Sequence, residues 1–328
     1  MLTCHRYNFK CLAEQDFVPI SFFGNTLRGG FGYAFKSIVC HSRNSECADC
    51  HYKKNCPYAR VFETINNGDC EIMRKADHLP HPFVISPYPL PEILNPGEEF
   101  KFEIILFGEY YHYIPYFIVS FIRLGRRGLV RDGNMFKVKS VASLEPDREH
   151  EIYSDGSSHL KDLGQQWKWN DFRENGVVQL KRDGSNGEHS ERRTEKKDEL
   201  TIEFLSPARF KSDGKPVTSE SISFSFFFRT LIRRLYNISF IYCNYRDENG
   251  FKQLIEEAAT IKVKKSDLKW VDRMRYSTRQ KKRIDIGGLT GQITFKGDLG
   301  KYMGFLEAGE LFHVGNNTSF GLGKYRIV

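Results

Sequence analysis

Segments with the patterns of strands and helices follow one another in a fixed order through the first half of the chain. Apolar residues alternate over residues 3–13, and a helical pattern then develops within Phe17–Val39. A strand is predicted at Glu99–Gly108, a helix at Tyr111–Leu124 and a further strand at Met135–Ala142. This succession constrains the fold, because strands that alternate with helices must form a sheet with helices packed against it.

The second half repeats this order. Its longest helix is predicted from apolar residues at offsets of 0, 3, 4, 7, 11 and 14, namely Phe224, Phe227, Phe228, Leu231, Leu235 and Ile238. The other elements expected here are a strand at Leu200–Phe204, a turn at Ser206–Gly214, a strand at Gly287–Phe295, a helix near Leu299–Gly309 and a strand at Gly323–Val328. The chain is therefore predicted to be an α+β protein with two tandem ferredoxin-like (RRM-like) domains and a C-terminal glycine-rich loop.

The length of 328 residues accommodates two domains of ordinary size. We expect an N-terminal ferredoxin-like domain at 1–145 with a cysteine-rich loop at 40–56, and a C-terminal ferredoxin-like domain at 200–328. Residues 146–199 are predicted to be a polar insertion or linker, since Lys181–Glu199 mixes six basic with six acidic residues.

The net charge is +8, and its excess is concentrated in Lys262–Arg283, where ten Lys or Arg face two Asp. Such a concentration favours a polyanionic partner. The N-terminus has no apolar core of signal-peptide length, and the most apolar stretches carry charges. We therefore expect a cytoplasmic protein with no membrane partner.

Ten glycines fall between Gly287 and Gly323. Glycine tolerates positive φ and has no Cβ, so successive amide N–H groups can approach an anion such as a phosphate. The sequence indicates a segment that approaches a nucleic-acid backbone closely.

Five blocks in the C-terminal half resemble the Cas6 family of CRISPR precursor-RNA endoribonucleases, in the superfamily of repeat-associated mysterious proteins. The blocks are Leu205–Lys211, Arg233–Tyr236, Arg275–Gln280, Gly287–Gly291 and His313–Tyr325, and Gly24–Gly32 and Cys56–Glu63 add N-terminal similarity. The loop departs from the family pattern because Asn316 and Asn317 follow Gly315 in place of a basic residue.

The resemblance implies a metal-independent hydrolase of antiviral defence that binds CRISPR repeat RNA. It would process precursor transcripts into guide RNAs, leaving a 2',3'-cyclic phosphate and a 5'-hydroxyl. Other CRISPR effector subunits would be further partners. Two alternatives are a non-catalytic RNA-binding subunit of an effector complex and a zinc-ordered module that recruits proteins.

RNA contacts are expected where cations alternate with aromatic residues, because bases stack on rings while cations pair with phosphates. Besides the glycine-rich loop, two segments fit this description: the basic stretch Lys262–Arg283 and the first helix. In the first helix Arg28 could bind a phosphate, while the glycines that follow it could instead allow close helix packing. The candidates are Arg28, Arg275, Tyr276, Arg279, Gln280, Lys281, Lys282, Arg283, Gly315, Gly321, Gly323 and Lys324.

Four cysteines, Cys40, Cys47, Cys50 and Cys56, have the spacing C-x6-C-x2-C-x5-C. Four thiolates satisfy tetrahedral zinc, and the metal would order a loop with few apolar residues. We expect a structural zinc, with four reduced thiols as the alternative. No cofactor is expected for catalysis, because the substrate supplies the attacking 2'-hydroxyl.

Histidine is the side chain suited to accept that proton near neutral pH. By the resemblance, the base is His41 or His51, together with Tyr33 and Lys53 or Lys54. His313, directly before the glycine-rich loop, is the competing candidate; its alternative role is to brace the loop by a hydrogen bond to the backbone.

Overall fold

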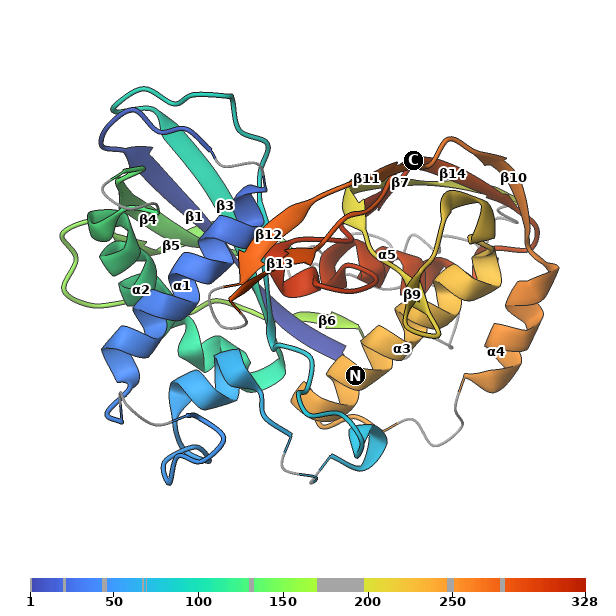
Figure 1. The fold of residues 1–328 in the computed structure, drawn as a ribbon, viewed down its shortest axis with the longest axis horizontal. Helices are drawn as coiled ribbons and strands as arrows, with labels where there is room; N and C mark the ends of the chain where they lie inside the picture. The colour runs from blue at the N-terminus through green and yellow to red at the C-terminus, as the bar shows by residue number, and fades with distance from the viewer. Residues whose placement is uncertain are drawn as a thin grey trace. The chain divides into compact units, whose positions relative to one another are not determined.

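The computed structural model describes residues 2–19, 22–42, 46–66, 68, 70–129, 133–169, 198–246, 251–277 and 281–328. They form two compact units (Figure 1). The N-terminal unit comprises Thr3–Trp167 with Ile241–Asn244, and the C-terminal unit comprises Lys168–Phe240 and Tyr245–Val328 with the first two residues.

The sheet of the N-terminal unit has the strand order β2-β3-β1-β4-β5, and its neighbouring strands are antiparallel. Helices α1 and α2 connect β1 to β2 and β3 to β4. This is the order of a ferredoxin-like domain with one strand added at the edge. The bounds are β1 Leu2–Ala13, α1 Phe23–Val39, β2 Phe83–Pro87, β3 Glu99–Phe107, α2 Ile114–Arg127, β4 Phe136–Leu144 and β5 Glu149–Ser154; β6 Trp167–Trp169 also pairs with β1.

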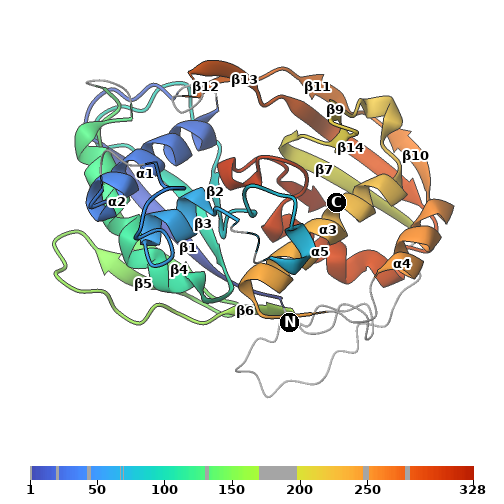
Figure 2. The same ribbon diagram turned by 60° about the horizontal axis from the view of Figure 1, so that its bottom comes forward.

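The sheet of the C-terminal unit has the order β10-β14-β7-β15, and Figure 2 shows it beside α3 and α5. The strand order repeats that of the N-terminal unit, which confirms the predicted pair of tandem ferredoxin-like domains. The bounds are β7 Glu199–Ala208, β8 Lys211–Ser212, β9 Lys215–Pro216, α3 Phe224–Tyr242, α4 Lys252–Glu257, β10 Lys262–Ser266, β11 Lys269–Val271, β12 Met274–Ser277, β13 Lys282–Asp285, β14 Gly288–Lys296, α5 Met303–Phe312 and β15 Tyr325–Ile327.

Several boundaries differ from the sequence prediction. Pro115 stands in the first turn of α2, where its fixed φ and missing N–H favour a helix start, and the 3-10 turn Gly108–Tyr113 precedes it. Strand β7 continues through Ala208 into the predicted turn, since it pairs with both β14 and β15. Within the predicted insertion, β5 pairs with β4, while residues 170–197 lie outside the described residues.

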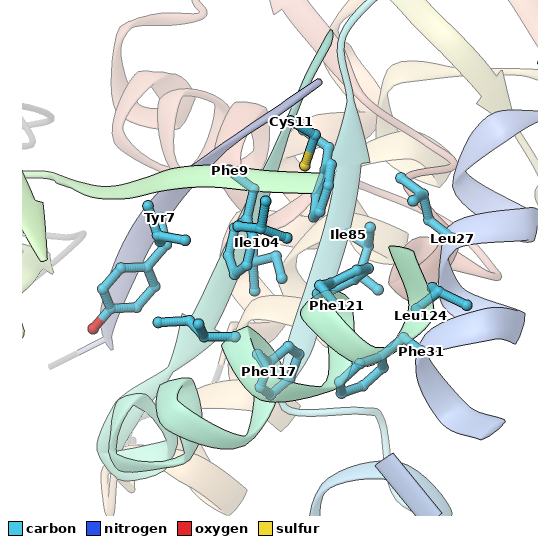
Figure 3. Close-up of a cluster of buried hydrophobic side chains, with 14 of the residues drawn as sticks. Tyr7, Phe9, Cys11, Leu27, Phe31, Ile85, Ile104, Phe117, Phe121 and Leu124 are labelled. Atoms are coloured by element: carbon cyan, nitrogen blue, oxygen red, sulfur yellow. The ribbon is translucent and has the colours of Figure 1, made fainter. Parts of the chain in front are cut away.

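The core of the N-terminal unit is built from phenylalanines that face inward from α1, α2 and the sheet (Figure 3). Phe31 of α1 stacks on Phe117 of α2 with ring centroids 4.3 Å apart, and Phe9 of β1 stacks on Phe102 of β3 at 4.9 Å. Stacked and tilted ring pairs add to the free energy gained by burying apolar area. The alternation of β1 and the period of α1 thus place their apolar residues on one core.

Glycines of α1 serve this packing. A Cβ on Gly30 would lie 2.7 Å from Leu124 of α2, and one on Gly32 would lie 2.1 Å from Phe62. A Cβ on Gly29 would meet nothing within 4 Å. Two of the three glycines are therefore explained by helix packing, the alternative that the sequence left open.

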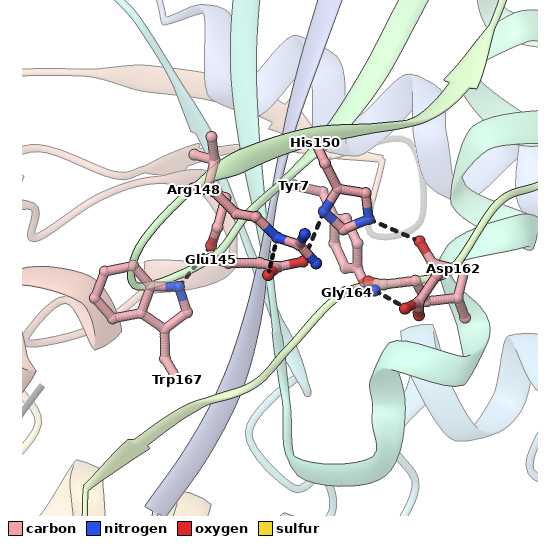
Figure 4. A network of polar contacts seen from close by, with 9 residues as sticks. Tyr7, Glu145, Arg148, His150, Asp162, Gly164 and Trp167 are labelled. Carbon is pink, nitrogen blue, oxygen red and sulfur yellow. Dashed lines mark hydrogen bonds and ion pairs between the residues drawn. The ribbon is translucent and has the colours of Figure 1, made fainter. Parts of the chain in front are cut away.

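A polar network holds the β4–β5 hairpin to the segment before β6 (Figure 4). The buried Glu145 carboxylate pairs with His150 Nδ1 at 2.6 Å and with Arg148 Nε at 2.9 Å. His150 also donates through Nε2 to the Asp162 carbonyl at 3.0 Å. Because both partners of Glu145 come from the same hairpin, the buried charge is compensated locally.

Among the described residues, no helix is long and apolar enough to cross a membrane.

The surroundings of Gly29 and Gly125 predict opposite effects of alanine. Gly29→Ala should raise the free energy of unfolding by about 0.5–1 kcal/mol, because alanine favours the helix and space is open. Gly125→Ala should lower it by about 1–3 kcal/mol, because the new Cβ would lie 2.0 Å from the Phe136 carbonyl oxygen. Urea denaturation followed by circular dichroism measures both; equal stability of the two variants would contradict this packing.

Candidate nucleic-acid interface

The glycine loop, residues 313–324, connects α5 to β15. A Cβ on Gly315 would lie 2.5 Å from the Arg209 carbonyl oxygen, and one on Gly323 would lie 1.8 Å from the Val314 carbonyl oxygen. Both glycines have positive φ, +83° and +71°. These two glycines lie against backbone atoms of the protein itself. From the sequence alone, they are expected to lie close to an RNA backbone.

Hydrogen bonds fasten the loop to the end of β7. Asn316 N–H donates to the Arg209 carbonyl at 2.8 Å, and Gly323 N–H donates to the Pro207 carbonyl at 3.0 Å. Ser206 Oγ donates to the Gly321 carbonyl at 2.7 Å and accepts from the Lys324 amide at 2.9 Å. The loop is thus held in one conformation by the Ser206–Arg209 block.

The N–H groups of Gly315 and Asn317 have no acceptor in the part of the chain that the structure describes. Both residues are half-buried, and Asn316 between them is exposed. These amides at the outer turn of the loop can receive an anion. The contribution of Gly315, Gly321 and Gly323 to RNA binding stays a prediction.

Arg209 is buried and joins three elements. Its Nη1 donates to Asp285 Oδ2 at 2.9 Å and to the Gly287 carbonyl at 2.8 Å. Burial acts to raise the pKa of Asp285, but hydrogen bonds from the Gly287 amide and Arg209 more than offset it, and the pKa is lowered. The role of Arg209 is therefore structural: its hydrogen bonds hold β13 and the start of β14 beside the loop.

The hairpin of β12 and β13 carries the predicted basic stretch to the same place. Arg275 lies over the Phe320 ring of the glycine loop, 4.8 Å from its centroid, and burial lowers the pKa of this arginine. Its Nε is buried without a hydrogen-bond partner among the described residues. Two regions that the sequence indicated separately are thus brought into contact by one cation–π pair.

The other hairpin candidates differ in exposure. Lys281, Lys282 and Arg283 are exposed and have no carboxylate partner among the residues described. Tyr276 lies in β12 opposite Arg283, whereas Arg279 and Gln280 fall outside the described residues. The hairpin therefore presents an uncompensated cationic end.

His313 ends α5 with a φ of +59° and is 1% exposed. Its Nδ1 donates to the Leu322 carbonyl at 3.1 Å, and its buried Nε2 has no partner among the described residues. Burial, with a contribution from the nearby Lys324 charge, lowers the pKa of His313 to about 3. A neutral, buried and weakly basic ring fits the bracing role better than the role of general base.

The candidates of the N-terminal unit lie on its surface. His41, His51 and Lys54 are exposed, and Lys53 donates to the Ala48 carbonyl at 2.6 Å. Tyr33 is 60% exposed on α1. No hydrogen bond, ion pair or ring contact joins two side chains of this group in the described part of the chain, so their catalytic roles stay predictions.

Arg28 and His81 form a contact that the sequence did not suggest. The Arg28 guanidinium hydrogen-bonds to His81 Nε2 and lies 4.4 Å above the Phe62 ring. Thr64 Oγ1 is 3.3 Å from His81 Nδ1. No motif links an α1 arginine to a histidine before β2, so only the tertiary fold could reveal this pair.

The four cysteines proposed for zinc are half-buried. Burial raises the pKa of Cys47 to about 11, and Cys40 and Cys56 are near enough to contribute. Within the ranges that the structure describes, which leave out residues 43–45 of this loop, no three His, Cys, Asp or Glu side chains form a group that could hold a metal. The zinc site stays a prediction.

Two ferredoxin-like units, the second with a glycine loop beside a basic hairpin, define a tandem α+β protein with an RRM-like fold. Residues 202–325 match the family model described as CRISPR-associated endoribonuclease Cas6, and residues 2–165 match the AF_1859_N model, described as an N-terminal domain. The C-terminal part of the chain, residues 202–325, therefore belongs to the Cas6 family.

A curated relative from Archaeoglobus fulgidus, described as an uncharacterized protein, is 24% identical over 310 residues, which cover 93% of this chain and 91% of the relative. Among solved structures, Cas6 of Thermus thermophilus matches with a TM-score of 0.53 and 13% identity over 100% of this chain and 99% of its own. A Cas6 product complex matches with a TM-score of 0.55 and 14% identity over the whole of both chains.

A chain of a partial Cas6-RT-Cas1–Cas2 complex matches with a TM-score of 0.59 and 15% identity. The match covers 100% of this chain and 46% of that chain, so this protein spans about half the length of that relative. At these identities the similarity establishes the fold.

The buried His313 predicts a specific pH dependence of stability. In an unfolded chain histidine titrates near pH 6.5, whereas His313 in the folded protein has a pKa of about 3. The unfolded state therefore binds the extra proton between these values, and stability that is fully present above pH 6.5 decreases as the pH falls towards 3.

From pH 7.5 to 5.5, the wild type should lose about 1.4 kcal/mol more unfolding free energy than His313→Asn. Asparagine tolerates the positive φ and retains an N–H donor. Urea unfolding at both pH values tests this; identical pH dependences would show that His313 titrates normally.

Proposed function

We propose that this chain is an endoribonuclease that binds CRISPR repeat RNA and cleaves precursor transcripts into guide RNAs. The observation that carries the proposal is the contact of the basic β12–β13 hairpin with the glycine loop through Arg275 and Phe320, in a unit that matches the Cas6 family. The hairpin supplies exposed cations and the loop supplies free amides. Both are groups that bind phosphates.

Lys281, Lys282 and Arg283 would bind successive phosphates of the repeat, while Gly315 and Asn317 N–H groups would receive one phosphate at the outer turn of the loop. Lys324, next to Gly323, is the nearest cation of the loop itself. The rigid attachment of the loop to β7 favours binding, because little conformational entropy is lost when RNA arrives.

Cleavage would proceed by attack of the substrate's 2'-hydroxyl oxygen on the adjacent phosphorus. A base accepts the hydroxyl proton, the bond from phosphorus to the 5'-oxygen breaks, and that oxygen takes up a proton. The products are a 2',3'-cyclic phosphate and a 5'-hydroxyl. In this proposal metal takes no part, because the substrate supplies the nucleophile and side chains can move the protons.

His41 and His51 are the proposed bases, with Tyr33 and Lys54 as their proposed partners. Both histidines are exposed and make no hydrogen bond within the described structure, so both rings are accessible to a substrate. His313 is buried, and its lowered pKa makes it a poor proton acceptor at neutral pH. We assign His313 to bracing the glycine loop.

Other CRISPR proteins are proposed partners. One relative is part of a complex named for Cas6, RT, Cas1 and Cas2, and its chain is about twice as long as this one. By analogy with that assembly, this chain would act beside further subunits.

Incubating the protein with repeat RNA in EDTA, beside the same RNA with a 2'-deoxy substitution at the scissile nucleotide, tests the proposal. Cleavage should persist in EDTA and fail with the deoxy substrate. His41→Ala or His51→Ala should reduce the single-turnover rate by about 100-fold or more, while binding is retained. His159→Ala, which removes another exposed histidine, is the matched control and should cleave normally.

Tight binding without cleavage under all these conditions would contradict the nuclease and support an RNA-holding subunit. The double variant Lys282→Ala, Arg283→Ala should bind RNA more weakly whether the protein is a nuclease or an RNA-holding subunit. The affinity should also depend less on salt, because two phosphate contacts are lost.

We also propose that Cys40, Cys47, Cys50 and Cys56 bind a structural zinc. Protein purified without added metal should contain about one equivalent of zinc by mass spectrometry, and Cys47→Ser with Cys50→Ser should lose it. The double variant should also melt at a lower temperature. Metal-free wild-type protein with the same melting temperature as the zinc-loaded form would exclude the structural role.

A further inference from the structure

The helices of the N-terminal unit carry an unusual charge pattern. Neither α1 nor α2 contains an acidic residue. Together they contain five cations: Arg28, Lys36, Arg123, Arg126 and Arg127. An exposed helix layer of a globular protein normally mixes both signs of charge, so this layer creates a positive field over one side of the sheet.

Exposed residues of α2 form one continuous stripe. Tyr116, Val119, Arg123 and Arg127 are spaced by three, four and four residues, which places them on one face, and Arg126 lies beside Arg127. Tyr116 and Val119 are 36% and 50% exposed. The stripe therefore presents an aromatic ring, an apolar side chain and three guanidinium groups to solvent.

Helix α1 adds a second aromatic ring to this stripe. The two helices lie side by side (Figure 1), with Gly30 packed on Leu124. The Arg127 guanidinium lies 3.8 Å above the centroid of the Tyr33 ring. We call the six residues Tyr33, Tyr116, Val119, Arg123, Arg126 and Arg127 the helix face. Its arginine–tyrosine stack holds a cation and a flat ring in fixed positions.

Stabilisation of the helix alone does not account for the helix face. Arg126 and Arg127 in the last turn of α2 favour the negative end of the helix dipole. That effect needs neither Arg123, one turn earlier, nor the exposed Tyr33 and Tyr116. It also gives no reason for the lack of acidic residues on both helices.

A cavity of about 500 Å³ opens beside the helix face. Arg126 belongs to both, and Ile122, Lys137 and Tyr153 also line the cavity. Lys137 is paired with Asp155 at 2.6 Å, and Glu14 also lines the cavity, so acidic and basic side chains balance inside it. The cavity offers space for a planar group next to a cation.

We propose that the helix face binds single-stranded RNA. Arginines on helices that contain no acidic residue can pair with phosphates, and exposed tyrosines stack on unpaired bases. A double-stranded partner would offer no free base faces to Tyr33 and Tyr116. The surface belongs to the N-terminal unit and contains no residue of the hairpin or the glycine loop. Tyr33 is also a proposed partner of the catalytic bases, but binding of RNA to the helix face does not require cleavage.

The probe is a fluorescent 20-nucleotide oligouridine with 2'-O-methyl groups, which cannot be cut because the 2'-oxygen is blocked. Fluorescence anisotropy measures its affinity for the full chain between 50 and 300 mM salt. The triple variant Arg123→Ala, Arg126→Ala and Arg127→Ala should bind at least about 10-fold more weakly. Its slope of log K against log salt should be shallower by about two, since each single-strand phosphate contact contributes about 0.7.

The matched control removes three exposed cations elsewhere on the same unit, by Arg74→Ala, Lys75→Ala and Lys101→Ala. It has the same net charge as the triple variant and should retain wild-type affinity and slope. Tyr33→Ala should lose at least about 5-fold in affinity, whereas Tyr33→Phe, which keeps the ring, should not. Circular dichroism melts establish that each variant is folded.

Equal losses in the triple variant and the control would overturn the proposal, because they would reflect net charge alone. A second result would also overturn it: polyglutamate displaces the probe as effectively as unlabelled oligouridine does, and Tyr33→Ala has no effect on the affinity. That result would indicate that the partner is an acidic protein surface. If Lys282→Ala with Arg283→Ala weakens binding while helix-face variants bind normally, the inference fails and the proposed function stands.

Discussion

The C-terminal unit depends on a close approach between two backbone segments, the glycine loop and the end of β7. Gly315 and Gly323 occupy positions where any Cβ would overlap a carbonyl oxygen, and amides of the loop donate to Pro207 and Arg209. This contact leaves the outer turn of the loop, with Gly315 and Asn317, facing outward. The same contact places Phe320 under Arg275, so the basic hairpin is positioned by the loop as well as by its own strand pairing.

Three arginines of the C-terminal unit have different roles in this molecule. Arg209 is buried and hydrogen-bonded to Asp285 and Gly287, so its guanidinium links neighbouring segments of the protein. Arg275 stacks on an aromatic ring, and Arg283 is exposed at the end of the hairpin. A guanidinium can satisfy carboxylates, carbonyls, rings or phosphates, and the choice is decided by what the fold brings within reach.

The fold was predictable because each element carries its own signal. The alternation of β1 and the apolar face of α3 depend only on neighbouring residues, and the element order left few possible topologies. The candidate site was less accessible. The Arg28–His81 contact spans 53 positions without a motif, and the burial of His313 depends on packing around the glycine loop. The spacing of Cys40 to Cys56 indicated a metal site, but spacing does not determine where the sulfurs point.

By itself, the sequence determined the doubled α+β architecture, the family and the concentration of positive charge, since periodicity, motif and composition are properties of the linear chain. Only the tertiary structure decided which glycines face the protein's own backbone, that His313 is neutral and buried, and that Tyr33 meets Arg127 across two helices. These outcomes depend on burial and on contacts between residues far apart in the chain. Both follow from the packing of the elements, because desolvation and close approach are set by three-dimensional surroundings.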